Sequence, residues 1–118
     1  MNELHSVLAE LMKTLEQSVT DYRNYIVAGK TFRHAQLLKL NNGKSLLLLF
    51  DLKKKFPAVL QSDVNALIHH YTVWTHKWEE LAAALNPGPD DEFVFPNTVT
   101  FPREAAQRLE NCYREMTG

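Results

Sequence analysis

Seven large apolar side chains recur in alternating steps of three and four residues between positions 64 and 85. They are Val64, Leu67, Tyr71, Trp74, Trp78, Leu81 and Leu85. This spacing follows the helical period, so all seven lie on one stripe of one helix. Ser62 or Asp63 is the expected N-cap, and Asn86–Pro87–Gly88–Pro89 is the expected end. A stripe this large needs partner helices, and the pattern therefore predicts a helical bundle.

The first residues repeat the same alternating pattern. One stripe contains Leu4, Leu8, Leu11, Leu15, Ser18, Tyr22 and Tyr25, and it is widened by Val7, Met12, Val19 and Ile26. We expect a helix from about Asn2, as N-cap, to Ala28. Gly29 then suits the C′ position, where a left-handed conformation ends a helix.

Residues 31–56 are ambiguous. Asn42–Gly43 between apolar runs is a strong β-hairpin signal. However, Leu and Lys dominate the segment and favour helix over strand. Thr31 can cap a helix, and Lys53–Lys54–Lys55 suits a helix C-terminus ahead of Phe56–Pro57. We therefore favour helix, either continuous or broken at Asn42–Gly43, and keep a hairpin as the alternative.

Residues 93–101 change to a period of two. Phe93, Phe95, Val99 and Phe101 fall on alternate positions, with Pro96 among them. Because proline is excluded from central strands, we expect an extended strap across the bundle. Pro102 then opens a last helix, and one side of that helix carries Ala105, Leu109, Cys112 and Met116, with Ala106 and Tyr113 beside them.

Together these elements predict an all-α protein. We expect one domain, 1–118, that forms an antiparallel bundle of about four helices with an extended strap before the last helix. A long amphipathic helix followed by a Leu/Lys-rich one, over about residues 1–85, is similar in layout to small bacterial helical chaperones of secretion and flagellar export. That similarity is carried by no motif.

Composition narrows the cellular setting. The longest apolar run, 46–50, is far too short to span a bilayer, and the charges within 1–20 exclude a signal-peptide core. Cys112 is the single cysteine, which rules out an internal disulfide. We expect a cytoplasmic protein, with Cys112 packed rather than reactive.

The net charge of −1 hides a basic segment. Residues 23–55 carry eight basic residues and one acidic residue, Asp51. Three interpretations stay open: neutralisation by the flanking acidic helices, an acidic protein partner, or nucleic acid. Few aromatic residues interleave with the bases, and the whole chain is acidic, so nucleic acid is the least favoured.

The histidines of the third predicted helix suggest a metal site as an alternative. His69, His76 and Glu80 lie near one line of that helix, with His70 and Glu79 beside them. A metal there needs ligands from another helix, and the His-Glu-x-x-His and Cys/His signatures are missing from the sequence. Relative to Trp74 and Trp78, His69 and His76 are expected to point toward solvent.

We therefore expect a non-enzymatic binding module without a cofactor, such as an adaptor, export chaperone or inhibitor. Five successive apolar residues, 46–50, cover nearly every side of a helix, so either that helix is central or one side stays exposed for a partner. The predicted contact residues are Leu47, Leu48, Phe50, Lys53, Lys54 and Trp78. Large apolar groups supply binding energy and lysines steer the encounter. The expected partner is another protein, and self-association stays open.

Overall fold

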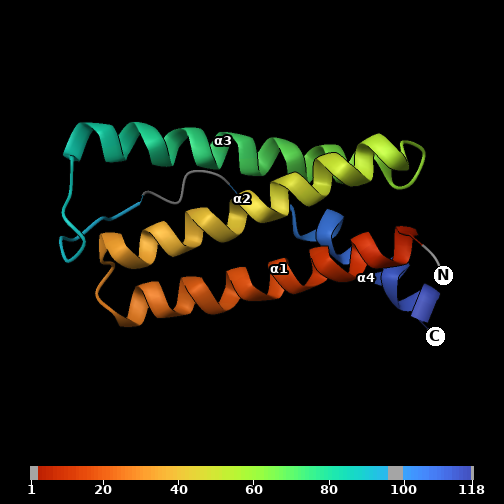
Figure 1. Cartoon of the computed structure of the whole chain (residues 1–118), viewed down its shortest axis with the longest axis horizontal. Coiled ribbons are helices and arrows are strands. Elements are labelled where there is room, and N and C mark those ends of the chain that lie inside the picture. Colours follow the sequence, from red (N-terminus) through yellow and green to blue (C-terminus); the bar gives the residue numbers. More distant parts are fainter. Residues whose placement is uncertain (1–2, 96–99, 118) are drawn as a thin grey trace.

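The computed structural model describes residues 3–95 and 100–117, which form four helices (Figure 1). They are α1 (Glu3–Val27), α2 (Phe32–Lys55), α3 (Gln61–Leu85) and α4 (Arg103–Thr117). The first three run antiparallel in succession, with α2 packed against both α1 and α3. The shorter α4 packs on α1 and α3 at the end where both chain termini lie. The predicted all-α four-helix fold is confirmed.

The first helix ends in the manner expected from Gly29. This residue has a φ of +82°, and Lys30 after it is also left-handed at +59°. The Lys30 N–H donates to Tyr25 O at 2.8 Å and the Gly29 N–H donates to Ile26 O at 3.1 Å. These two bonds make a Schellman motif, which satisfies carbonyls that the helix end leaves open. The proposed Asn2 cap lies outside the described residues.

The second helix continues without a break through residues 41–43, so the β-hairpin alternative is wrong. Both asparagines are buried and face α1 rather than forming a turn. Asn41 Nδ2 donates to the carbonyl of Thr14 at 2.8 Å, and Asn42 Oδ1 accepts from Ser18 Oγ at 3.0 Å. Because buried amides must find partners, these bonds stabilise the helical register against the local turn preference.

The predicted cap of α3 is also wrong. The N-cap is Leu60, which is left-handed at a φ of +45°, and the helix begins at Gln61. Leu60 packs against the core, and its carbonyl accepts the Val64 N–H at 2.9 Å. Asp63 is thereby placed in the first turn, where its carboxylate is bound by Arg108 of α4 instead of capping the helix.

Two core clusters lie along the bundle. The first is closed by α4 and contains Val7, Leu8, Leu11, Leu49, Leu52, Val64, Leu67, Tyr71, Ala105 and Leu109. The second contains Tyr25, Ala35, Leu38, Trp78 and Phe93. The predicted stripe of α3 spans both clusters, although Trp74 is only half-buried and Leu85 is exposed at its end.

The strap is part of the second cluster. Phe93 is fully buried, Val94 is exposed and Phe95 is half-buried, as the period of two predicts. The Tyr25 hydroxyl donates to the Phe93 carbonyl, and the Phe95 N–H donates to that hydroxyl at 3.2 Å. The Phe93 N–H also donates to Lys30 O at 2.8 Å. Val99 lies outside the described residues.

Candidate interaction surfaces

An apolar stripe runs along the solvent side of α2. Leu40, Gly43, Leu47 and Phe50 follow one another in steps of three, four and three, so they share a face. Leu47 is 71% exposed, Leu40 61% and Phe50 47%. We call the side chains of Leu40, Leu47 and Phe50 the outer stripe. The buried residues Leu38, Ser45 and Leu52 lie on the opposite side of α2, and that side packs against the bundle. No helix of the bundle therefore covers the outer stripe.

A shallow groove of ≈ 610 Å³ lies beside the first half of this stripe, and we call it the α2 groove. Phe32 and Trp78 form its aromatic side, with ring centroids 5.5 Å apart. The other lining residues are Gln36, Lys39, Leu40, Gly43, Lys44 and Leu47. A methyl group added to Gly43 would meet no atom within 4 Å. The missing side chain of Gly43 therefore leaves open space in the groove.

Four lysines flank the outer stripe, namely Lys39, Lys44, Lys53 and Lys54. Lys39 Nζ lies 4.8 Å from the centroid of the Trp78 ring, a cation–π distance. Within the described ranges none of the four has an ion-pair partner. By contrast, Lys55 is bound to Glu3 of α1 at 2.8 Å. Neutralisation within the fold thus reaches only part of the basic segment.

The structure sorts the predicted contact residues into two groups. Leu47, Phe50, Lys53 and Lys54 lie exposed on α2 as expected. Leu48 is half-buried and packs against the first core cluster, because it lies about 100° around the helix from Leu47. Trp78 is only 5% exposed and belongs to the second cluster, so it forms a wall of the α2 groove rather than a free surface.

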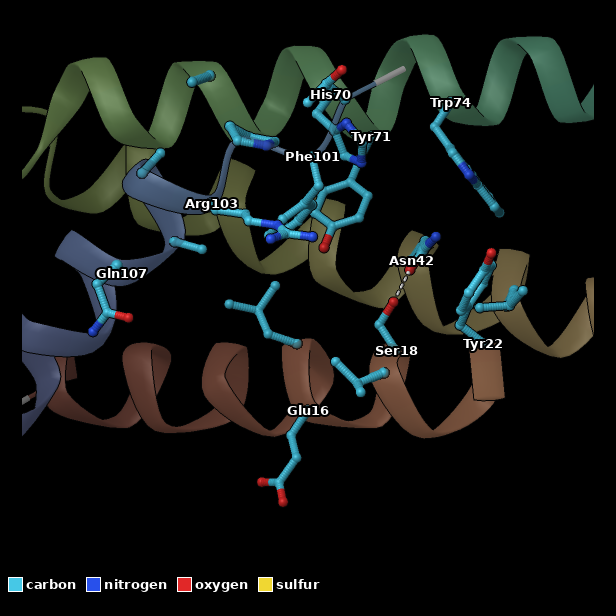
Figure 2. Close-up of a pocket in the computed structure, with 18 of the residues that line it drawn as sticks. Glu16, Ser18, Tyr22, Asn42, His70, Tyr71, Trp74, Phe101, Arg103 and Gln107 are labelled. Atoms are coloured by element: carbon cyan, nitrogen blue, oxygen red, sulfur yellow. Dashed lines mark hydrogen bonds between the residues drawn. The ribbon is translucent and has the colours of Figure 1, made fainter. Parts of the chain in front are cut away.

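A larger pocket opens between α1 and α3 (Figure 2). The two helices lie on opposite sides of α2, and the 15 residues of α4 fill only one end of the space between them. The volume of ≈ 1530 Å³ exceeds the roughly 300–1,000 Å³ of small-molecule sites. Tyr22 of α1 and Trp74 of α3 stand on opposite sides of it, with Asn42 of α2 between them. Its size and open shape suit contact with a macromolecule better than capture of a small ligand.

Two titratable groups of α3 lie in this pocket. Burial raises the pKa of Tyr71 to about 12, so its phenol stays neutral at physiological pH. Burial also lowers the pKa of His70, an effect opposed by the backbone at Thr100. The His70 ring packs edge-on against Phe101 at 5.2 Å, and its Nδ1 is buried without a hydrogen-bond partner. We infer that His70 serves as a neutral packing residue under the strap.

The proposed metal residues are not assembled. His69 is exposed, and His76 Nε2 lies 2.6 Å from Glu80 Oε1 on the surface of α3. Within 3–95 and 100–117, no three His, Cys, Asp or Glu side chains are placed to hold a metal ion. Cys112 is half-buried against the first cluster, consistent with a packed thiol.

Sequence reasoning missed the full apolar stripe of α2 and the buried position of His70 in α3. Leu40 and Gly43 complete a stripe with Leu47 and Phe50 that keeps the helical spacing, and this spacing is visible in the sequence. The Asn42–Gly43 turn signal lies within the same segment and obscures this spacing. No signal in the sequence distinguishes His70, which is buried, from the adjacent His69, which is exposed.

Neither a protein-family model, nor a curated protein, nor a solved structure matches this chain. Among residues 3–95 and 100–117, no helix combines the length and the apolar character that crossing a membrane requires.

Proposed function

We propose that this protein is a non-enzymatic binding module that holds an acidic, amphipathic helix of another protein along α2. The observation that supports this is the outer stripe, exposed beside the α2 groove and flanked by four lysines that have no ion-pair partner among the described residues. Uncompensated charge of one sign attracts the opposite sign. A helix with leucine-like residues on one face and glutamates beside them matches both the stripe and the charges.

The shape of the surface favours a helix over a lipid or a phosphate backbone. The α2 groove is concave, and Gly43 leaves space in it for a side chain of the partner. An interfacial membrane helix lays its apolar face into the lipid headgroup boundary, where a concave groove would stay unfilled. A phosphate backbone is bound by lysine and arginine side chains and would leave the apolar stripe without a partner. Leu40, Leu47 and Phe50 therefore supply the anchor contacts, and the lysines accelerate association.

Binding of defined probes tests the proposal. The probe is a fluorescent helical peptide of about 18 residues, five turns, with leucines in three/four spacing and glutamates on both flanks. Its control is the same peptide with lysine in place of glutamate. We expect saturable binding of the acidic peptide only, measured by fluorescence anisotropy. Binding of anionic vesicles or of RNA instead of the peptide, or no binding to any probe, overturns the proposal.

Matched variants locate the site. Leu47→Asp should weaken binding of the acidic peptide, because an anchor side chain is lost. Lys54→Glu should lower the affinity by about tenfold or less, because Lys54 is a charge at the rim of the site. Lys77→Glu makes the same charge change on the exposed surface of α3 and should leave affinity nearly unchanged. Equal effects of Lys54→Glu and Lys77→Glu would show that only the overall charge matters.

A further inference from the structure

The C-terminal half of α1 exposes a second apolar stripe that the proposed function does not use. Leu15, Val19, Tyr22 and Ile26 follow one another in steps of four, three and four. Val19 is 59% exposed, Tyr22 53% and Ile26 42%, whereas Leu15 is half-buried against the first cluster. We call these four residues the α1 seam. Earlier on the same stripe Leu8 is fully buried in the cluster that α4 closes, so the seam is uncovered only where α4 does not reach.

The seam has the spacing of a coiled-coil contact. With Val19 and Ile26 at heptad position a, Leu15 and Tyr22 fall at position d. The next positions, e, are then Glu16 and Arg23. Both are exposed, and within the described residues neither has an ion-pair partner. In Figure 2 Glu16 points away from the pocket while Tyr22 points into it, so the charge lies at the outer border of the seam.

The other border of the seam is already occupied. Ser18, at position g, is hydrogen-bonded to Asn42 of α2, and Tyr25 is buried in the second cluster. Only the side that carries Glu16 and Arg23 is free to meet a partner. In an antiparallel pair of helices, positions a and d face each other and e residues of the two chains lie side by side.

We propose that two copies of this chain associate through antiparallel packing of their α1 seams. Val19 of one copy packs on Tyr22 of the other, and Leu15 packs on Ile26. Glu16 of each copy then pairs with Arg23 of the other, so the same surface is complementary to itself across a two-fold axis. This charge complementarity favours a second copy over an unrelated helix. None of the seam residues lines the α2 groove, so the proposal is independent of the proposed function.

Sedimentation of the full chain between about 1 μM and 1 mM tests the association, since a contact this small is expected to be weak. We expect a reversible monomer–dimer equilibrium that weakens as salt is added. Glu16→Arg and Arg23→Glu each place two like-charge pairs across the axis and should raise the dissociation constant about tenfold. The double variant should restore it. A wild-type chain that stays monomeric throughout the range overturns the proposal.

Mixing the two single variants gives the sharpest test. Two copies of either variant repel, but one copy of each restores both attractive pairs, so the mixture should form a heterodimer. The controls are Glu79→Arg and Lys77→Glu, two exposed positions on α3 that produce the same net charges. Both keep the wild-type seam, so each alone should self-associate as the wild type does, and mixing them should bring no gain. A mixture of the seam variants that associates no more tightly than either variant alone, or the same loss of self-association in the α3 variants, would show that the α1 seam is not the interface. Circular dichroism confirms that each variant remains folded.

Discussion

Arg108 of α4 donates from Nε to Oδ1 of Asp63 in the first turn of α3 at 2.9 Å, and its Nη2 forms an ion pair with the same oxygen at 2.9 Å. The Asp63 side chain is 9% exposed, whereas that of Arg108 is about half exposed. The carboxylate also lies near the positive end of the α3 dipole. Burial of a carboxylate is unfavourable without such partners, so this contact fixes α4 against the bundle.

Removing this carboxylate should therefore destabilise the fold. We expect Asp63→Ala to lower the free energy of unfolding by about 1.5–3 kcal/mol, the range of hydrogen bonds to charged groups. Glu104→Ala is the control, because Glu104 lies 4.0 Å from Arg108 and is exposed. Its effect should stay within about 0.5 kcal/mol. Urea unfolding at neutral pH measures both, and equal losses would contradict a specific role for Asp63.

The two tryptophans of α3 should differ in their contribution to stability. Trp78 is buried and contacts the rings of Phe32 and Phe93, whereas Trp74 is half-buried and contacts Phe95. Trp78→Ala should cost about 3–5 kcal/mol, the range for a large core aromatic. Trp74→Ala should cost less, because fewer of its contacts are lost. Denaturant titration of both variants measures this difference, and a larger loss for Trp74→Ala would contradict the assignment of the second cluster.

Two substitutions of Gly43 should affect stability and peptide binding differently. Glycine within a helix costs about 0.8–1 kcal/mol relative to alanine, and the space around Gly43 is open. Gly43→Ala should therefore stabilise the protein by about that amount, measured as a higher urea midpoint. Gly43→Leu should remain folded but fill the α2 groove and abolish binding of the acidic peptide. Unchanged affinity in Gly43→Leu would show that the partner does not enter the groove.

His70 should make stability fall on mild acidification. Its folded-state pKa is lowered by burial, and the unfolded value is about 6.5. Between these two values the unfolded chain binds more protons, so stability decreases as the pH falls below about 6.5 and stops changing below the folded pKa. The slope from this one group cannot exceed about 1.4 kcal/mol per pH unit.

Comparison with His70→Gln isolates this contribution. Unfolding titrations at neutral pH and about one unit below the unfolded-histidine pKa should show a smaller loss on acidification for the variant than for the wild type. An NMR titration of the His70 imidazole should give a midpoint below the value of about 6.5 for a histidine in an unfolded chain. A His70 midpoint at or above that value would contradict the burial argument.

Much of the fold followed from local patterns. The three/four spacing of α1 and α3 predicted two long helices, and Gly29 and Asn86 ended them where expected. The alternation of Phe93 with Phe95 predicted an extended strap. These predictions succeeded because backbone geometry repeats every few residues, so its signature is present in the order of apolar and polar side chains.

The candidate surfaces could be predicted from the sequence only in part. The sequence indicated that one side of the apolar run 46–50 could remain exposed, but not that Leu48 faces the core while Leu47 does not. It also gave two residues as caps of α3, whereas the fold uses Leu60 and leaves Asp63 to Arg108. Both outcomes depend on which neighbour reaches a given side of a helix.

The sequence by itself determined that this protein is a set of amphipathic helices with a basic second helix, because helical period and charge are properties of the chain order. The tertiary structure decided that α4 packs on only one end of α1, that Gly43 leaves a groove beside the outer stripe, and that four lysines have no acidic partner among the described residues. These features arise from how far each helix extends past its neighbours, which is set by packing between residues distant in the chain.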